Sequence, residues 1–396
     1  PSSTEAKAAW DAWLTAMANR YKDSVDTWEI WNEPVGPVSA ADYTELYLRS
    51  AQIIRNIQPD AKLIAIGFAG IDLNYVDDFL AGVSAQGKLG LINEISYHAY
   101  TQIPESHYSS VQNLKNRIAS RSGTSHIKVY QGENGAPSKK GGYGALAGYD
   151  WTEKTQAKWN LRRMMGDLSR DIATNVFTLM ELQYTTGLNS KGLLQRKADY
   201  SVDRPKEAYF AVRNVTALFD NRVRRLTNFA PVHNGGSSLQ ISGYEKLSSS
   251  MPMIVLWKGS SVPSDTDNIT SVDVMAPLMQ FKEPVLADLR TGSVVTIPSG
   301  TWGPENGGTK FFGLPVTDSP VVVAERIAVH SPYDRWVLAR FTETEAMNLS
   351  ISGKTSDPDG DGICNLLDFA TARPEASKES ILKITRPTTG AILEFN

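Results

Sequence analysis

Two glutamates, Glu33 and Glu133, have the surroundings of catalytic carboxylates. Glu33 lies in the string TWEIWNEP, and Glu133 lies in KVYQGENG. Each string has the composition of a buried strand that stops at the carboxylate, because Pro34 has no amide hydrogen to donate and Gly132 and Gly135 flank Glu133. Cleavage of a glycosidic bond needs two carboxylates. One protonates the departing oxygen, and the other attacks the anomeric carbon or activates a water.

Each glutamate taken alone has a simpler interpretation. A single Glu after a strand is usually a solvated loop residue or a partner in a helix cap. Trp-Asn-Glu-Pro is nevertheless a rare string, and its position at the start of a loop is typical of functional sites. The two strings together therefore favour a pair of catalytic carboxylates.

The two strings resemble motifs of the clan A glycoside hydrolases, which are retaining enzymes built on a (β/α)₈ barrel. The resemblance implies that Glu33 ends the fourth strand as the acid/base and that Glu133 ends the seventh strand as the nucleophile. A third string, EISYHAY, contains His98 and Tyr100 and matches the His-x-Tyr that ends the sixth strand in several families of the clan. Within the clan, the sequence is most similar to family 39 or an unclassified relative. The implied reaction is double displacement at a β-glycosidic bond of a poly- or oligosaccharide.

The same resemblance implies the contacts with the carbohydrate. Asn32 is expected to bind the 2-hydroxyl of the sugar, and Tyr100 is expected to hold Glu133. His98 is expected to contact the substrate or Glu33, although a lone His is equally typical of a packed core. Three aromatic residues complete the expected substrate-binding set, and each of them is also a candidate packing group: Trp31, Tyr143 and Trp151.

Alternating helices and strands are predicted to position these residues. Helices are predicted over 4–20, 40–58, 76–83, 107–121, 152–171 and 204–220. Strands are predicted up to Glu33 and over 62–70, 94–100, 127–135 and 175–184. Such alternation is typical of an α/β fold with a parallel sheet.

The five strands correspond to strands four to eight of a (β/α)₈ barrel if Glu33 ends strand four. We therefore expect residues 1–222 to form part of a catalytic barrel and the chain to belong to a longer product. A smaller open sheet is the alternative. Residues 223–330 have short apolar runs cut by Gly, Pro, Asn and Ser, which is typical of a β-sandwich. This accessory domain is expected to support the barrel or to be an independent sugar-binding module.

The segment 331–396 contains a loop with the ligand spacing of an EF-hand. Gly362 stands at the sixth position of this loop, and Asp replaces the usual Glu at the twelfth. Six residues are the expected calcium ligands: Asp357, Asp359, Asp361, Ile363 through its carbonyl, Asn365 and Asp368. A metal-free acidic turn is the alternative. Calcium would be structural, and we expect no cofactor in catalysis.

The composition excludes several other classes of protein. The chain has 396 residues, a net charge of −3 and 41% hydrophobic residues, so it can bury a sizeable core and lacks the basic surface of a nucleic-acid-binding protein. Cys364 is the only cysteine, so no disulfide forms within the chain. No apolar run approaches the roughly 20 residues of a membrane span. The sequence leaves the oligomeric state open.

The C-terminal segment resembles one found on exported proteins of environmental bacteria, so we expect a secreted or periplasmic protein. Two other functions remain open at this stage. One is a carbohydrate-binding protein without catalysis, or an inactive fragment of an enzyme. The other is a calcium-dependent adhesion protein, which would leave the two glutamate strings without an explanation.

Overall fold

A computed structural model describes residues 3–330, 332–371, 382–385 and 392–395. The described residues form two compact units, Pro1–Ala324 and Glu325–Asn396. The first unit contains both the expected barrel portion and the expected sandwich. The division between the units falls six residues before the boundary that we expected at residue 330. Among the described residues, no helix has the length and apolar character needed to cross a bilayer.

The first half of unit 1 is a parallel sheet with helices packed around it. Its strands are β1 (Thr27–Ile30), β2 (Lys62–Phe68), β3 (Glu94–Tyr97), β4 (Lys128–Gln131) and β5 (Ala173–Thr174). They pair in sequence order, and every pairing is parallel. The predicted alternation of strand and helix is therefore confirmed. The sheet is open, and the assignment of its strands to positions four to eight of a barrel stays a prediction.

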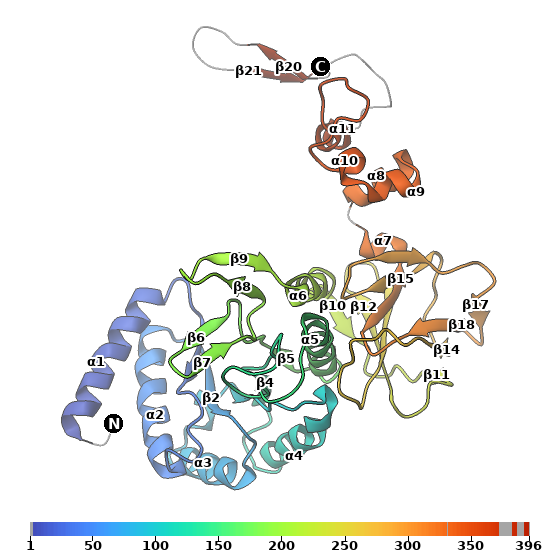
Figure 1. Cartoon of the computed structure of the whole chain (residues 1–396). Helices are drawn as coiled ribbons and strands as arrows, with labels where there is room; N and C mark the ends of the chain where they lie inside the picture. Colours follow the sequence, from blue (N-terminus) through green and yellow to red (C-terminus); the bar gives the residue numbers. More distant parts are fainter. Residues whose placement is uncertain (1–2, 331, 372–381, 386–391, 396) are drawn as a thin grey trace. The chain divides into compact units, whose positions relative to one another are not determined.

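The helices of this half follow the predicted ranges closely. They are α1 (Thr4–Tyr21), α2 (Ala40–Ile57), α3 (Leu73–Ala85), α4 (Tyr108–Ala119), α5 (Glu153–Leu168) and α6 (Glu207–Leu218), with short 3₁₀ turns η1 (Leu89–Leu91) and η2 (Pro104–His107). Figure 1 shows that α1 to α4 form an arc around the outside of the sheet. Polar caps fix several helix starts: the side chains of Ser3, Ser39 and Asp72 each accept a backbone hydrogen bond in the first turn.

The last predicted strand, 175–184, is misplaced. Only Ala173 and Thr174 pair with β4, and the chain then leaves the sheet. Residues 182–184 instead form β6 (Leu182–Tyr184), which pairs antiparallel with β7 (Gly187–Asn189). The run is apolar enough for a buried strand, but Glu181 turns inward to pair with Lys206 at 2.7 Å and holds the segment outside the sheet.

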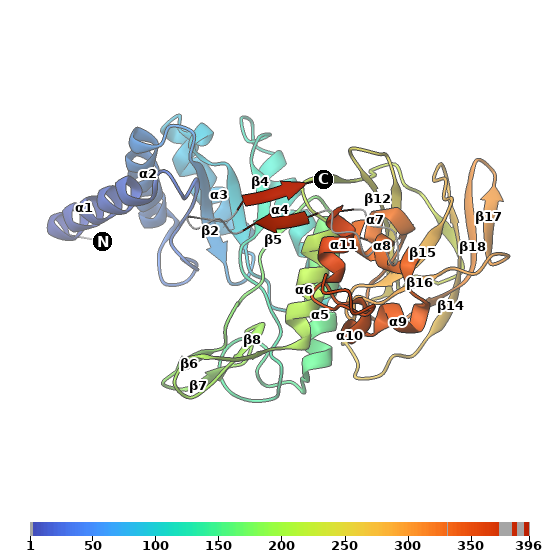
Figure 2. The same ribbon diagram turned by 90° about the horizontal axis from the view of Figure 1, so that it is seen from above.

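A second small hairpin follows the first. It joins β8 (Leu194–Arg196) to β9 (Val202–Pro205), and the chain then enters α6. Seen from above in Figure 2, β6, β7 and β8 lie together beside α5 and α6.

Two antiparallel sheets follow α6 and form the expected sandwich. The six-stranded sheet has the order β10 (Val223–Arg225), β12 (Leu239–Lys246), β13 (Pro252–Lys258), β19 (Val321–Glu325), β15 (Pro284–Asp288) and β16 (Val294–Thr296). The four-stranded sheet has the order β11 (Val232–His233), β14 (Thr270–Ala276), β18 (Gly308–Val316) and β17 (Trp302–Glu305). Buried residues of both sheets form one apolar core. The first strand of the sandwich, β10, begins at Val223.

Unit 2 contains short helices and one hairpin. These are α7 (Arg326–Val329), α8 (Pro332–Arg340), α9 (Glu343–Met347), α10 (Leu349–Ser352), α11 (Asn365–Thr371), β20 (Leu382–Thr385) and β21 (Ile392–Phe395). A cluster of aromatic rings from α8 and α11 holds this unit together, with Tyr333, Trp336 and Phe369 at centroid distances between 5.5 and 6.2 Å.

Helix α5 is buried all round from Thr155 to Asp167, including the charged residues of that stretch. Arg162 is fully buried and donates two hydrogen bonds to Glu105, at 2.8 and 2.6 Å. The indole of Trp257, on strand β13 of the sandwich, donates to the same carboxylate at 2.8 Å. Glu105 therefore links the helical layer to the sandwich, because one buried carboxylate satisfies donors from both.

We predict that Glu105→Gln lowers the free energy of unfolding by about 3 kcal/mol, because it leaves the buried Arg162 guanidinium without its counter-charge. Chemical denaturation followed by tryptophan fluorescence measures the change. Asp220→Asn is the matched control, since it breaks the more exposed pair with Arg222 and should change the free energy of unfolding much less. Equal losses in the two variants would contradict the prediction.

Candidate active site

The candidate site is built at the carboxyl ends of β1, β3 and β4 of the parallel sheet, in which β2 lies between β1 and β3. Backbone hydrogen bonds continue the ladder past the strands: Glu33 donates to the carbonyl of Gly67 at 3.1 Å, and His98 donates to the carbonyl of Phe68 at 2.7 Å. Parallel strands bring their carboxyl ends to the same edge of a sheet. The two predicted catalytic residues, Glu33 and Glu133, therefore meet there.

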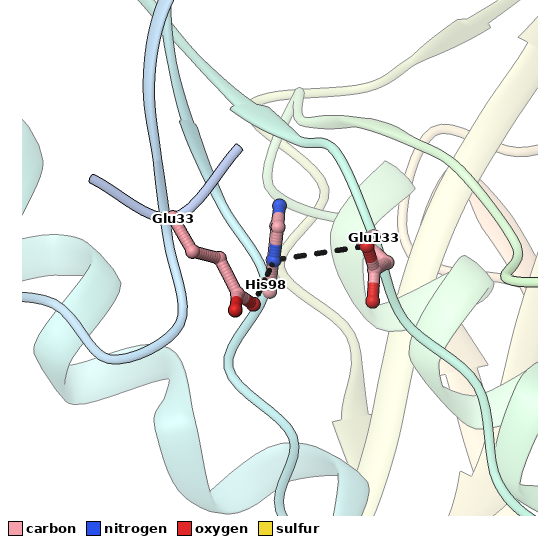
Figure 3. Close-up of side chains that lie close together, drawn as sticks. All are labelled: Glu33, His98 and Glu133. Carbon is pink, nitrogen blue, oxygen red and sulfur yellow. Dashed lines mark hydrogen bonds and ion pairs between the residues drawn. The ribbon is translucent and has the colours of Figure 1, made fainter. Parts of the chain in front are cut away.

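The side chains of Glu33, His98 and Glu133 form one cluster (Figure 3). One oxygen of each carboxylate and one ring nitrogen of the histidine lie within 4.8 Å of one another. The His98 ring is 1% exposed, and its Nδ1 lies 2.7 Å from Glu33 and 4.0 Å from Glu133. Of the two contacts expected for His98, the structure shows the one with Glu33.

Tyr100 contacts the second glutamate. Its hydroxyl donates to Glu133 Oε1 at 2.7 Å. Burial and the adjacent charge of Glu133 raise the pKa of Tyr100 above its usual range, so the phenol stays protonated and remains a donor. Tyr100 thus holds Glu133 as the resemblance implied.

Gln131 is a positioning residue that sequence reasoning missed. It is fully buried, and its Nε2 donates to the backbone carbonyls of His98, at 2.6 Å, and of Glu133, at 2.9 Å. One amide therefore fixes the backbone of two cluster residues relative to each other. Its place two residues before Glu133, on the same side of the strand, is the signal that could have identified it.

The backbone around the cluster contains several left-handed residues. Trp31, Glu33 and Ala99 have φ values of +68°, +49° and +48°. Each such conformation costs about 1–3 kcal/mol in a residue other than glycine, and such residues gather at functional sites. Here they allow β1 and β3 to turn sharply and direct the Glu33 and His98 side chains toward each other.

A third carboxylate, Glu29, lies near the cluster and was also missed. It is on β1, two residues before Trp31. Neighbouring strands partly desolvate it and raise its pKa, while Ser96 and His98 act in the opposite direction. The negative charge of Glu133 adds to the rise.

The expected substrate-binding residues fall into two groups. The side chains of Trp31 and Tyr143 are 43% and 44% exposed, and Asn32, next to Glu33 in the chain, is also exposed. The Tyr143 ring packs on the Tyr184 ring, with 4.7 Å between the ring centres. These side chains are available to a sugar. Trp151 is different.

Trp151 was expected to stack on a sugar, but the structure places it in a packed core. It is 5% exposed and packs with Ala136 and Trp159, while its indole donates to the Leu146 carbonyl at 2.8 Å. Its ring face is therefore covered by protein. The Gly-rich loop folds back over the start of α5, and sequence composition alone did not reveal that.

The predicted calcium loop, in unit 2, is only partly assembled as a ligand set. Carboxylate oxygens of Asp357, Asp359 and Asp361 lie within 4.8 Å of one another and are exposed. The remaining expected ligands take other contacts. Asn365 donates to the carbonyls of Ile351 and Gly353, and Asp368 lies 3.8 Å from Arg340. The Ile363 amide donates to Asp361, and this bond does not involve the carbonyl that was expected to bind calcium.

No family model and no curated protein matches this chain. Solved structures do match in fold. A family 39 glycoside hydrolase from Bacteroides cellulosilyticus WH2 gives a TM-score of 0.56 at 17% identity, over 82% of this chain and 63% of that one. A GH51 arabinofuranosidase from Xanthomonas axonopodis pv. citri gives a TM-score of 0.52 at 12% identity, over 82% of this chain and 73% of that one.

These likenesses show a mixed α/β fold shared with glycoside hydrolases. The chain spans 63% of the length of the Bacteroides protein. At such low identity, the argument for activity depends on the geometry of the cluster itself.

We predict that Tyr100→Phe lowers kcat/KM on an aryl glycoside by about ten- to a hundredfold, because a hydrogen bond to a charged group is worth about 1.5–3 kcal/mol. Steady-state kinetics measures the change, and circular dichroism verifies the fold. The matched control is Tyr21→Phe, which removes the hydroxyl of an exposed tyrosine on α1. A Tyr100→Phe variant with the wild-type rate would show that Glu133 does not depend on this contact.

Proposed function

We propose that this protein is a glycoside hydrolase that cleaves β-glycosidic bonds with retention, similar to family 39 or a relative of it. The observation that carries the proposal is the cluster in which oxygens of Glu33 and Glu133 lie within 4.8 Å of a common histidine nitrogen and of each other. Retaining enzymes hold their two carboxyl groups about 5–5.5 Å apart, whereas inverting enzymes leave about 6.5–9.5 Å for a water. The spacing supports the retaining mechanism.

Glu133 acts as the nucleophile in this mechanism. Its carboxylate attacks the anomeric carbon and forms a glycosyl-enzyme ester, while the bond to the leaving oxygen breaks. The Tyr100 hydroxyl orients the attacking oxygen through its 2.7 Å hydrogen bond. Gln131 fixes the backbone carbonyl of the same residue.

Glu33 acts as the acid and then as the base. Protonated, it gives its proton to the leaving oxygen, and the resulting carboxylate removes a proton from the water that hydrolyses the ester. His98 is 2.7 Å from Glu33 and orients it through both steps. The exposed Asn32 lies next along the chain and is positioned to contact a sugar hydroxyl.

The surroundings of the cluster suggest how a saccharide is held. Tyr143 and Tyr184 form an exposed aromatic pair, and aromatic faces of this kind bind the apolar faces of sugars. We propose that the protein acts outside the cytoplasm, where polysaccharides are met. The resemblance of the C-terminal segment to those of exported proteins supports this location.

We also propose that the loop at 357–368 binds a structural calcium ion. Three converging carboxylates and the EF-hand spacing support the proposal. Asn365 and Asp368 would have to turn toward the ion, and Asn365 Oδ1 is a buried oxygen without a hydrogen-bond donor among the described groups. Calcium would therefore draw the start of α11 toward the three aspartates.

We predict that Glu133→Gln abolishes turnover of aryl glycosides, because an amide is not an anionic nucleophile. Glu33→Ala should retain turnover of substrates with good leaving groups and should be accelerated by azide, an anion that attacks the anomeric carbon of the glycosyl-enzyme without needing a general base and releases Glu133 with formation of a glycosyl azide. The first-formed sugar anomer, followed by NMR, should have the configuration of the substrate. Near wild-type rates in both variants, or an inverted first product, would refute the proposed mechanism.

We predict that calcium binds the loop at 357–368 with a dissociation constant on the order of 10⁻⁴–10⁻³ M, the range of extracellular modules. Titration calorimetry on the wild type and on Asp359→Ala measures it, with magnesium as the control ion. Because the loop is in unit 2, chelation should leave glycosidase activity unchanged. Equal heats from the two proteins would show that the loop is an acidic turn.

A further inference from the structure

A buried lysine, Lys191, lies beside the proposed nucleophile and has no role in the mechanism described so far. It is in the connection between β7 and β8 and is 1% exposed. Its ammonium nitrogen lies 5.2 Å from the centre of the Tyr100 ring. Tyr100 is the residue that holds Glu133. Lys191 is therefore a cation at the wall of the proposed site.

Two other buried lysines, Lys158 and Lys206, are each neutralised by a nearby carboxylate. Lys158 lies 2.6 Å from Asp318, and Lys206 lies 2.7 Å from Glu181. The ammonium of Lys191 makes no hydrogen bond and has no carboxylate within 4.0 Å among the described residues. Burial of a charge is costly unless the charge is paired, so an unpaired buried ammonium at a site indicates an anionic partner that comes from outside the chain.

A second donor lies next to this ammonium. A methyl group placed on Gly144, which has φ of +97°, would lie 3.0 Å from both Lys191 Nζ and Asn189 Nδ2. The oxygen of the Asn189 amide accepts a hydrogen bond from the Lys191 backbone, which leaves Nδ2 as the donor end. Asn189 is 4% exposed. The ammonium and the amide thus face the same small space beneath the loop, and glycine at 144 keeps that space open.

A competing interpretation is that Lys191 stabilises the negative charge of Glu133. The charge of Glu133 favours the ammonium form, while burial lowers the pKa of Lys191 to about 8. At pH 7, roughly nine-tenths of such a group is still protonated. The ammonium is farther than 4.0 Å from Glu133, however, and its nearest ring is that of Tyr100. It therefore makes no direct ion pair with the nucleophile and keeps its hydrogen-bonding capacity for another group.

We propose that Lys191, with Asn189 beside it, binds an anionic substituent of the sugar held against Glu133, so that uronides or sulfated glycosides are the substrate class. The proposal rests on the proposed glycosidase function. A carboxylate and a sulfate ester share the required chemistry, because each offers several acceptor oxygens and a negative charge. A neutral sugar leaves the ammonium buried without an acceptor, and this disfavours its binding.

The test compares matched pairs of aryl glycosides on the full 396-residue chain. The neutral substrates are 4-nitrophenyl β-glucoside and 4-nitrophenyl β-galactoside. Each is compared with two anionic counterparts: the 4-nitrophenyl glycoside of the corresponding uronic acid, and the same glycoside sulfated at the 6-hydroxyl. We expect the anionic member of at least one pair to exceed its neutral partner at least tenfold in kcat/KM. Lys191→Met should remove that preference, lowering kcat/KM for the anionic member at least tenfold more than for its neutral partner. Lys191→Arg should keep the preference, because it keeps the charge. Whichever of the uronide and the sulfate has the higher kcat/KM identifies the anionic group that Lys191 binds.

A control variant separates local recognition from general electrostatics. Lys140→Met removes a positive charge from the same Gly-rich loop, where Lys140 is exposed and paired with Asp150. This variant should leave the preference for the anionic sugar unchanged. If Lys191→Met lowers the rates on neutral and anionic glycosides equally, Lys191 serves Glu133 and the proposal is wrong. Preference for the neutral sugar in every pair also overturns it.

A binding experiment tests the same inference without turnover. Titration calorimetry on Glu133→Gln compares glucuronate, galacturonate and glucose 6-sulfate with glucose and galactose. We expect at least tenfold tighter binding of an anionic sugar, lost when Lys191→Met is added. Equal affinities would overturn the proposal even if the glycosidase function holds. Anionic binding without hydrolysis of any glycoside would instead support the Lys191 site and refute the proposed catalytic function.

Discussion

The parallel hydrogen-bond ladder from β1 to β4 is the constraint on which the candidate site depends. It continues past the strand ends through the backbone amides of Glu33, His98 and Gly132. Each donates a hydrogen bond of 2.7–3.1 Å to a carbonyl of a neighbouring strand. The ladder fixes where each main chain leaves the sheet. The side chains of Glu33, His98 and Glu133 follow the ends of β1, β3 and β4, and they extend across the end of the sheet until their polar atoms lie within 4.8 Å of one another.

The same constraint explains why polar groups are buried behind the site. Strand ends held this closely need rigid supports, and Gln131 supplies one by donating to two carbonyls of the cluster. Farther out, Glu105 ties α5 to the sandwich through Arg162 and Trp257. These buried hydrogen bonds resist rearrangement, since a shift that broke one would leave a further buried polar group without a partner.

Sequence reasoning identified what depends on local patterns. Helix caps, the alternation of strand and helix, and the strings around Glu33 and Glu133 are local, and the structure brings the two glutamates together. Two predictions were wrong because contacts between residues distant in the sequence determine where those segments lie. The run 175–184 has strand composition, yet the Glu181–Lys206 pair holds it outside the sheet. Trp151 has the composition of a sugar-stacking residue, yet it packs against Trp159.

Lys191 and Glu29 could not be found from the sequence for a related reason. Neither belongs to a motif, and each matters only through the charges that the fold places around it. Glu29, Glu33 and Glu133 gather negative charge at one edge of the sheet, which raises the pKa of Glu29 further. His98 and Lys191 are the cationic or hydrogen-bonding groups placed against that charge. A site that already contains several carboxylates repels an added anion. It can bind one only beside a cation that has no carboxylate within ion-pair distance. Among the groups surrounding Glu133, Lys191 meets that condition. For this reason we expect Lys191, and not the two proposed catalytic carboxylates, to decide which sugars are accepted.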